Sequence, residues 1–154
     1  MGSVGPTRTV MNEKSDGLYR AAAWIMGACG LWLLVLGLYF VFGRPSLLPE
    51  DLRFMGTTLE AIETTVPGLQ GWLHNVFVVM GGFMAASGAL VLYLARTALA
   101  VRLKGAIGIF IVSGLLTVGL MSSMNFVLHS DFRWLLLIPV VLWFGGIACL
   151  VARR

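Results

Sequence analysis

Two histidines and two asparagines stand near the ends of two long apolar segments, where polar side chains are scarce. His74 and Asn75 are adjacent in one segment, and Asn125 and His129 lie four residues apart in the next. Residues four apart share one side of a helix, and at ~1.5 Å rise per residue we expect all four side chains in a layer less than ~10 Å thick. Imidazoles placed there could bind a metal, relay a proton or hold a polar ligand.

Two glutamates, Glu60 and Glu63, lie in the linker before this layer, and either could close the site from outside. The structural alternative is that the asparagines join helices through side-chain hydrogen bonds while the histidines extend to the membrane surface. Both interpretations stay open. The sequence requires no cofactor, although a metal at His74 and His129 is compatible with it, and no residue is assigned a catalytic role. The candidate ligand or metal site comprises His74, Asn75, Asn125, His129, Glu60 and Glu63.

The composition identifies the environment of these residues. The 154-residue chain is 58% hydrophobic and 12% charged, with a mean hydropathy of +0.90. An average soluble domain is roughly 45–50% apolar and about 25% charged. Disordered chains, soluble nucleic-acid-binding domains and disulfide-stabilised secreted modules are therefore excluded. The net charge of +4 is spread over short stretches between apolar runs, so it indicates membrane topology rather than a nucleic-acid partner.

Four segments contain no Asp, Glu, Lys or Arg: 21–42, 71–95, 105–130 and 134–152. About 20 apolar residues span a hydrocarbon core of ~30 Å, so each segment is long enough to cross a bilayer. Their continuous hydrophobicity favours helices over the alternating strands of a barrel. We predict an all-α polytopic membrane protein, with one domain over residues 1–154 and a four-helix transmembrane bundle. The expected spans are about 19–42, 71–95, 105–130 and 134–152.

The linkers predict how these helices are connected. The 28-residue linker 43–70 is expected to form a short helical cap. Pro49, followed by two acidic residues, is typical of a helix start, the segment 57–60 matches a capping box, and 67–68 would end the second cap helix. Only residues 131–133 join the last two spans, which predicts that these are antiparallel neighbours.

Lys and Arg are unevenly divided between the two sides of the predicted bundle. One side carries eight: Arg8, Lys14, Arg20, Arg96, Arg102, Lys104, Arg153 and Arg154. The other carries three: Arg44, Arg53 and Arg133. Because cytoplasmic loops are enriched in basic residues, we expect both termini in the cytoplasm and the cap 43–70 outside, with the protein integral to the cell membrane.

Small residues at helical spacing indicate where the helices pack, since lipid offers no hydrophobic drive for association and close contact must supply it. The expected packing glycines are Gly27, Gly30, Gly37, Gly81, Gly82, Gly114, Gly145 and Gly146. Pro139 should kink the last span, because proline has no N–H to donate to the helical ladder.

Three functions remain open, and the sequence favours the first. It is a non-catalytic accessory or interaction protein that binds a membrane-protein partner or forms a homo-oligomer within the lipid bilayer. The second is a small transporter or ligand- or metal-binding membrane protein that uses the His/Asn layer. The third is a membrane-embedded enzyme acting on a lipid, a quinone or a metal. The chain contains no Walker A, H-E-x-x-H or G-x-S-x-G motif and no acid within a span, which makes an enzyme less favoured.

Overall fold

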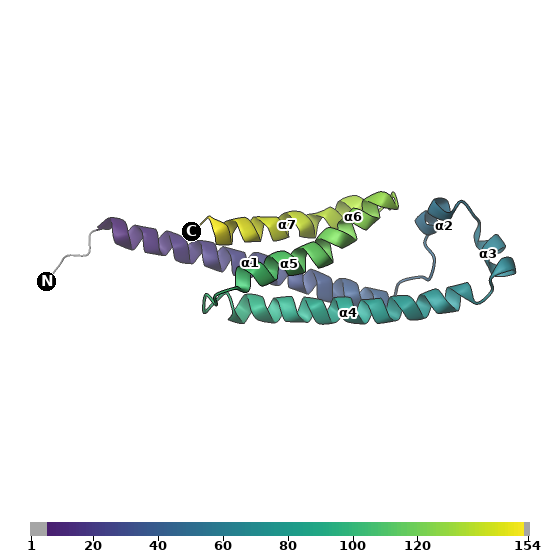
Figure 1. Cartoon of the computed structure of the whole chain (residues 1–154), viewed down its shortest axis with the longest axis horizontal. Helices are drawn as coiled ribbons and strands as arrows, with labels where there is room; N and C mark the ends of the chain where they lie inside the picture. The colour runs from purple at the N-terminus through teal and green to yellow at the C-terminus, as the bar shows by residue number, and fades with distance from the viewer. Residues whose placement is uncertain (1–5, 153–154) are drawn as a thin grey trace.

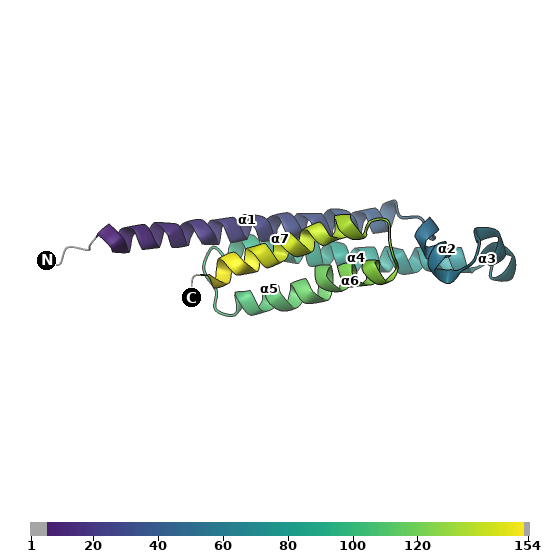
Figure 2. The same ribbon diagram turned by 90° about the horizontal axis from the view of Figure 1, so that it is seen from above.

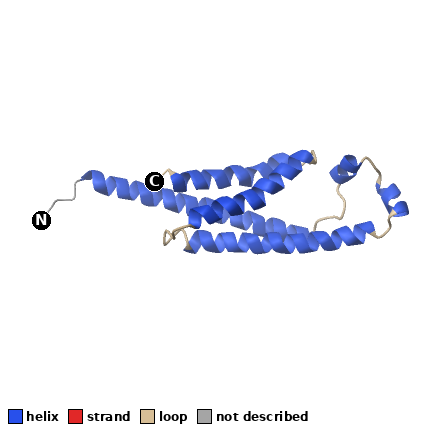
Figure 3. Cartoon of the chain, viewed as in Figure 1, coloured by secondary structure: helices blue, strands red, loops and turns tan. Residues whose placement is uncertain are grey.

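The computed structural model describes the backbone of residues 6–152 and the side chains of residues 17–152. Arg8, Lys14, Arg153 and Arg154, which entered the charge count, lie outside the described side chains. All regular structure in the described range is helical (Figure 3). The elements are α1 (Pro6–Phe42), α2 (Pro49–Met55), α3 (Leu59–Thr65), α4 (Leu69–Thr97), α5 (Ala106–Gly114), the π-helix η1 (Leu115–Gly119), α6 (Leu120–Val127) and α7 (Arg133–Val151).

Four helical spans in the described chain are long and apolar enough to cross a membrane. They are Gly17–Phe42 in α1, Leu69–Thr97 in α4, Ala106–Val127 across α5, η1 and α6, and Arg133–Val151 in α7. The uncharged segments of the sequence agree with these bounds to within a few residues. The all-α, multi-pass prediction is thereby confirmed.

The four spans run side by side along one long axis (Figures 1 and 2). The short helices α2 and α3 lie beyond one end of the bundle, while α1 begins and α7 ends toward the other (Figure 1). Contacts between α1 and α4 are the most extensive, and α1 also packs on α7. In turn α7 contacts α5, η1 and α6. By contrast, α4 and the α5–α6 span share few contacts, although only a short loop joins them.

Glycines allow the backbones of α1 and α4 to approach closely. A Cβ added to Gly81 would lie 2.6 Å from the carbonyl oxygen of Gly37, and one added to Gly30 would lie 2.9 Å from that of Gly88. These distances are shorter than any real Cβ contact, so each position excludes a side chain. Seven residues separate the two glycines on each helix, which is two turns and keeps both on one face.

The α5–α7 interface places a large side chain against a glycine instead. Trp143 is 2% exposed, and its ring lies where a Cβ on Gly114 would project. The indole Nε1 donates a hydrogen bond of 2.9 Å to the carbonyl oxygen of Phe110. The π-helical turn η1 begins directly after Gly114. Such turns in α-helices are frequent at functional sites, but here the neighbouring contact is a packed and satisfied tryptophan.

The other expected packing residues have mixed surroundings. A Cβ on Gly146 would lie 2.7 Å from Met26 Cε, whereas one on Gly27 would make an ordinary contact with Leu92. Within the described residues, nothing lies within 4 Å of a Cβ built on Gly82 or Gly145, so these two glycines face open space.

The proline of the last span lies within an uninterrupted helix. Pro139 is buried inside α7, which runs from Arg133 to Val151. The Cys29 thiol of α1 lies 3.7 Å from its carbonyl oxygen and donates to it. Pro139 therefore contributes to the contact between α1 and α7.

Local signals in the sequence account for the cap helices. Pro49 opens α2, and Gly56 ends it in the left-handed conformation with φ 66°. The Thr58 hydroxyl accepts a hydrogen bond of 3.2 Å from the Ala61 N–H and caps α3. The segment 43–70 is thus a helical cap, as its sequence predicts.

Candidate functional site

His74 and Asn75 lie near the start of α4, and both side chains are exposed. His74 stands seven residues before Gly81 and therefore on the side of α4 that faces α1. However, α1 ends at Phe42, and Phe40 already lies beside Gly81, so His74 projects beyond the last turn of α1. Asn75 has no hydrogen bond to any described residue.

Asn125 and His129 belong to the end of α6, and the structure gives each a local role. The Asn125 side-chain nitrogen donates to the Met121 carbonyl oxygen one turn earlier, at 2.9 Å. His129 is exposed and has φ 51°, the left-handed conformation typical of a residue that ends a helix. The Ser130 N–H donates to the Asn125 carbonyl and the His129 N–H to that of Phe126, at 3.0 and 3.1 Å. These two bonds form a Schellman motif, which satisfies carbonyls left free at the helix end.

The two glutamates lie on α3, in the outer part of the cap. Both are exposed, and Glu63 accepts a hydrogen bond of 2.8 Å from the side-chain nitrogen of Gln70 at the start of α4. In the described part of the chain, no hydrogen bond or ion pair joins any two of the six candidate residues. No group of three or more His, Cys, Asp or Glu side chains there is placed to hold a metal ion. Because α4 and α6 share few contacts, the two His/Asn pairs do not form one packed interface.

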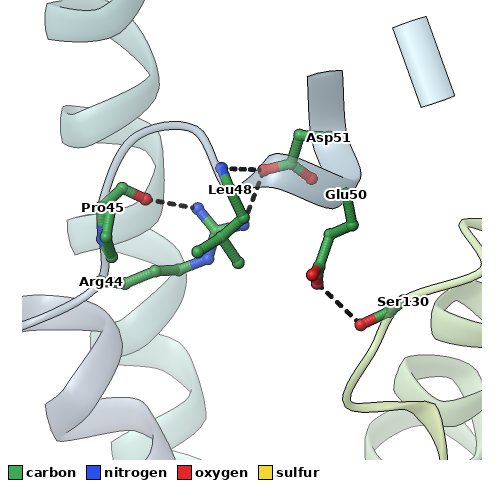
Figure 4. A network of polar contacts seen from close by, with 6 residues as sticks. All are labelled: Arg44, Pro45, Leu48, Glu50, Asp51 and Ser130. Atoms are coloured by element: carbon green, nitrogen blue, oxygen red, sulfur yellow. Dashed lines mark hydrogen bonds and ion pairs between the residues drawn. The ribbon is translucent and has the colours of Figure 1, made fainter. Parts of the chain in front are cut away.

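A polar cluster that the sequence analysis did not single out lies between the cap and the bundle (Figure 4). Glu50 of α2 is only 6% exposed, and its carboxylate accepts a hydrogen bond of 2.7 Å from the hydroxyl of Ser130, which is 1% exposed. The same hydroxyl accepts a bond of 3.1 Å from the Phe132 N–H. A buried carboxylate must be hydrogen-bonded to offset its desolvation. This contact attaches α2 to the loop between α6 and α7.

Arg44 attaches the other side of α2 to α1 and α4. Its guanidinium lies 3.5 Å from the Asp51 carboxylate, which also accepts a hydrogen bond from the Leu48 N–H at 2.8 Å (Figure 4). The guanidinium carbon is 3.6 Å from the centroid of the Phe77 ring and 5.1 Å from that of Phe40, which are cation–π distances. Burial lowers the pKa of Arg44, and the nearby carboxylate of Asp51 opposes this shift.

A third contact is exposed. The Arg53 guanidinium donates to both carboxylate oxygens of Asp131 at 2.8 and 2.9 Å, and the two side chains are 60% and 62% exposed. Together, these contacts connect α2 to α1, to α4 and to the loop between α6 and α7. The sequence identified Glu50 and Asp51 only as the start of a helix. Ser130 gave no signal, because its role depends on a partner 80 positions away.

One face of α4 combines small and polar residues that are exposed in the described part of the structure. Asn75, Gly82, Ala86 and Ala89 are all exposed. Their spacing of seven, four and three residues places them on one side of the helix. This α4 open face differs from the Gly81 and Gly88 face, which α1 covers.

No protein-family model, curated protein or solved structure matches the chain.

Proposed function

We propose that this membrane protein is a non-catalytic interaction protein that assembles in the bilayer through the α4 open face, with a second copy of the chain as its partner. The observation that carries the proposal is the exposed Gly82, beside which a Cβ would meet nothing within 4 Å. Small residues four apart, here Gly82 and Ala86, let two membrane helices approach until their backbones touch.

Asn75 favours a second copy over an unrelated helix. A side-chain amide carries both donors and an acceptor, so two copies of Asn75 can satisfy each other across a twofold axis. An axis along the membrane normal would place the two α4 helices parallel, with Asn75 opposite Asn75 and Gly82 opposite Gly82. An amide in apolar surroundings without a partner is costly, which gives this pairing a driving force.

The transporter and enzyme alternatives have less support. Both require His74 and His129 to act together, yet His74 lies on α4 and His129 follows the end of α6, and these two helices share few contacts. Asn125 and His129 also have structural roles at the end of α6. Self-association requires only residues that are already exposed on one helix.

Förster transfer between donor- and acceptor-labelled copies of the full chain in lipid vesicles tests the proposal. We expect transfer for the natural chain at high dilution in lipid, and its loss in Gly82→Leu/Ala86→Leu, because bulky side chains keep the backbones apart. Phe83→Leu is the matched control, since Phe83 is 74% exposed on another side of α4. A natural chain that shows no transfer, or a double variant that keeps full transfer, would refute self-association through this face.

A further inference from the structure

A cavity of about 630 Å³ lies at the end of the bundle opposite the cap. Its walls come from α1, the loop between α4 and α5, the first turns of α5 and the last turn of α7. This volume is within the roughly 300–1,000 Å³ range of small-molecule sites. The lining residues that matter for its chemistry are Tyr19, Arg102, Lys104, Ile107, Ile111 and Leu150.

The loop wall of the cavity is cationic. Arg102 and Lys104 both line it, and the Arg102 guanidinium carbon lies 5.0 Å from the centroid of the Tyr19 ring. Arg102 has φ 53° and Gly105 has φ 88°, so the loop turns sharply between the two spans. The two cationic side chains therefore enter the cavity wall from a short, sharply turned loop rather than from a long flexible one.

Backbone donors at the start of α5 add to this positive wall. Gly105 occupies the N-cap position and has no side chain to accept the first N–H groups. The Ala106 and Ile109 N–H groups bond to carbonyls of Leu103 and Gly105, but within the described residues no acceptor takes those of Ile107 and Gly108. Anions are stabilised beside such N–H groups by hydrogen bonding and by the helix dipole.

The rest of the wall is apolar and leads into the membrane-spanning part. Ile107 and Ile111 are one turn apart on α5, and the buried Leu150 faces them from α7. A small soluble anion would use only the cationic wall. A ligand with an anionic head and a hydrocarbon tail would cover both walls, as a membrane lipid does at the bilayer surface.

We infer that this cavity binds an anionic phospholipid, with its phosphate at Arg102, Lys104 and the start of α5 and an acyl chain along Ile107, Ile111 and Leu150. Basic pockets between membrane helices bind lipid headgroups in this way. Inorganic phosphate carries the same negative charge but has no hydrocarbon chain. A competition experiment can therefore distinguish it from a phospholipid. The inference does not depend on self-association through α4.

Native mass spectrometry of the full chain, titrated with phosphatidylglycerol, tests the inference. We expect retained phosphatidylglycerol, much weaker retention of phosphatidylcholine with the same acyl chains, and no competition from inorganic phosphate at equal concentration. Arg102→Gln/Lys104→Gln should weaken binding by roughly fivefold for each cation removed. Arg96→Gln is the matched control, because Arg96 is exposed at the end of α4 and does not line the cavity.

A second variant removes the space without removing charge. A Cβ on Gly108 would meet nothing within 4 Å, so Gly108→Leu should fold and project into the cavity. We expect it to lose lipid binding at an unchanged thermal midpoint. Unchanged phosphatidylglycerol binding in both variants would overturn the site, as would equal loss in Arg96→Gln. Full displacement of lipid by inorganic phosphate would overturn the lipid as its ligand.

Discussion

Glycine serves different purposes in two of the interfaces between the spans. Between α1 and α4, glycines on both helices face each other, and the obstacle to a larger side chain is backbone. Between α5 and α7, Gly114 alone makes room for the ring of Trp143, and the obstacle is a side chain. Backbone cannot be exchanged by mutation, whereas a side chain can. In the α1–α4 interface, no second substitution should therefore relieve the clash caused by replacing a glycine. In the α5–α7 interface, a smaller residue at position 143 should relieve it.

The largest effect is expected where backbone opposes backbone. Gly88→Leu would drive Cβ and the atoms beyond it into the carbonyl of Gly30 and the main chain at Leu34. Overpacking of this kind costs about 3 kcal/mol or more, since neither helix can yield without separating. Thermal unfolding in mild detergent should show a large loss of stability, or no folded protein. Gly145→Leu, which faces open space, is the control and should unfold close to the natural chain.

The second interface offers a rescue experiment. Gly114→Ala should cost about 1–3 kcal/mol, because its new methyl group meets the Trp143 indole. Adding Trp143→Leu should recover about 1 kcal/mol or more in a double-mutant cycle, even though the hydrogen bond to Phe110 is lost. Strict additivity of the two substitutions would mean that the glycine does not make room for this ring.

The spans could be predicted from the sequence, but not the order in which they pack. The uncharged runs mark the helices because charge is costly in lipid. The short loop 98–105 brings the ends of α4 and α5 together but does not decide which faces meet, and α4 instead packs along α1. Gly88 was not among the expected packing glycines, whereas Gly82 was. Only the position of the partner helix shows which glycine of α4 is covered and which is exposed.

The cap allows a similar comparison between two polar contacts, one buried and one exposed. Ser130→Ala would leave the buried Glu50 carboxylate without its hydroxyl donor and should cost about 1–3 kcal/mol. Asp131→Asn disturbs an exposed ion pair and should cost at most about 1 kcal/mol. Hydrogen exchange of α2 amides measures both. Equal protection loss in the two variants would show that burial does not set the strength of these contacts.

The smallest expected effect is a gain. His129 holds φ 51°, where glycine avoids a steric cost of roughly 1–2 kcal/mol that other residues carry. Histidine partly tolerates this region, so His129→Gly should raise the stability of the chain by up to about 1 kcal/mol. Thermal unfolding measures the change. A marked loss of stability would show that the contact between the imidazole Nδ1 and the Val127 carbonyl oxygen, at 3.1 Å, is worth more than the backbone strain at this position.

The candidate site shows that similar expected depth in the membrane does not by itself bring side chains into contact. The four polar residues His74, Asn75, Asn125 and His129 stand near the ends of their spans, as their positions in the sequence predict. Whether they meet depends on helix order, and the sequence carries no direct signal for it. The Glu50–Ser130 contact escaped for the same reason, since it joins segments 80 positions apart. Local signals such as Pro49 at the start of α2 could be predicted because they need no distant partner, whereas the N-cap of α3 is Thr58, one residue after the Thr57 that a capping box over 57–60 requires.

Cysteine cross-linking along α4 in native membranes tests the central claim most directly. The background is Cys29→Ser/Cys149→Ala, which removes both free thiols and keeps a donor toward Pro139. Single cysteines are then introduced by Gly82→Cys, Ala86→Cys, Ala89→Cys, Phe83→Cys and Leu90→Cys. Self-association through the α4 open face predicts covalent dimers from the first three and none from the last two. Dimers from Phe83→Cys and Leu90→Cys, or from all five positions equally, would contradict it.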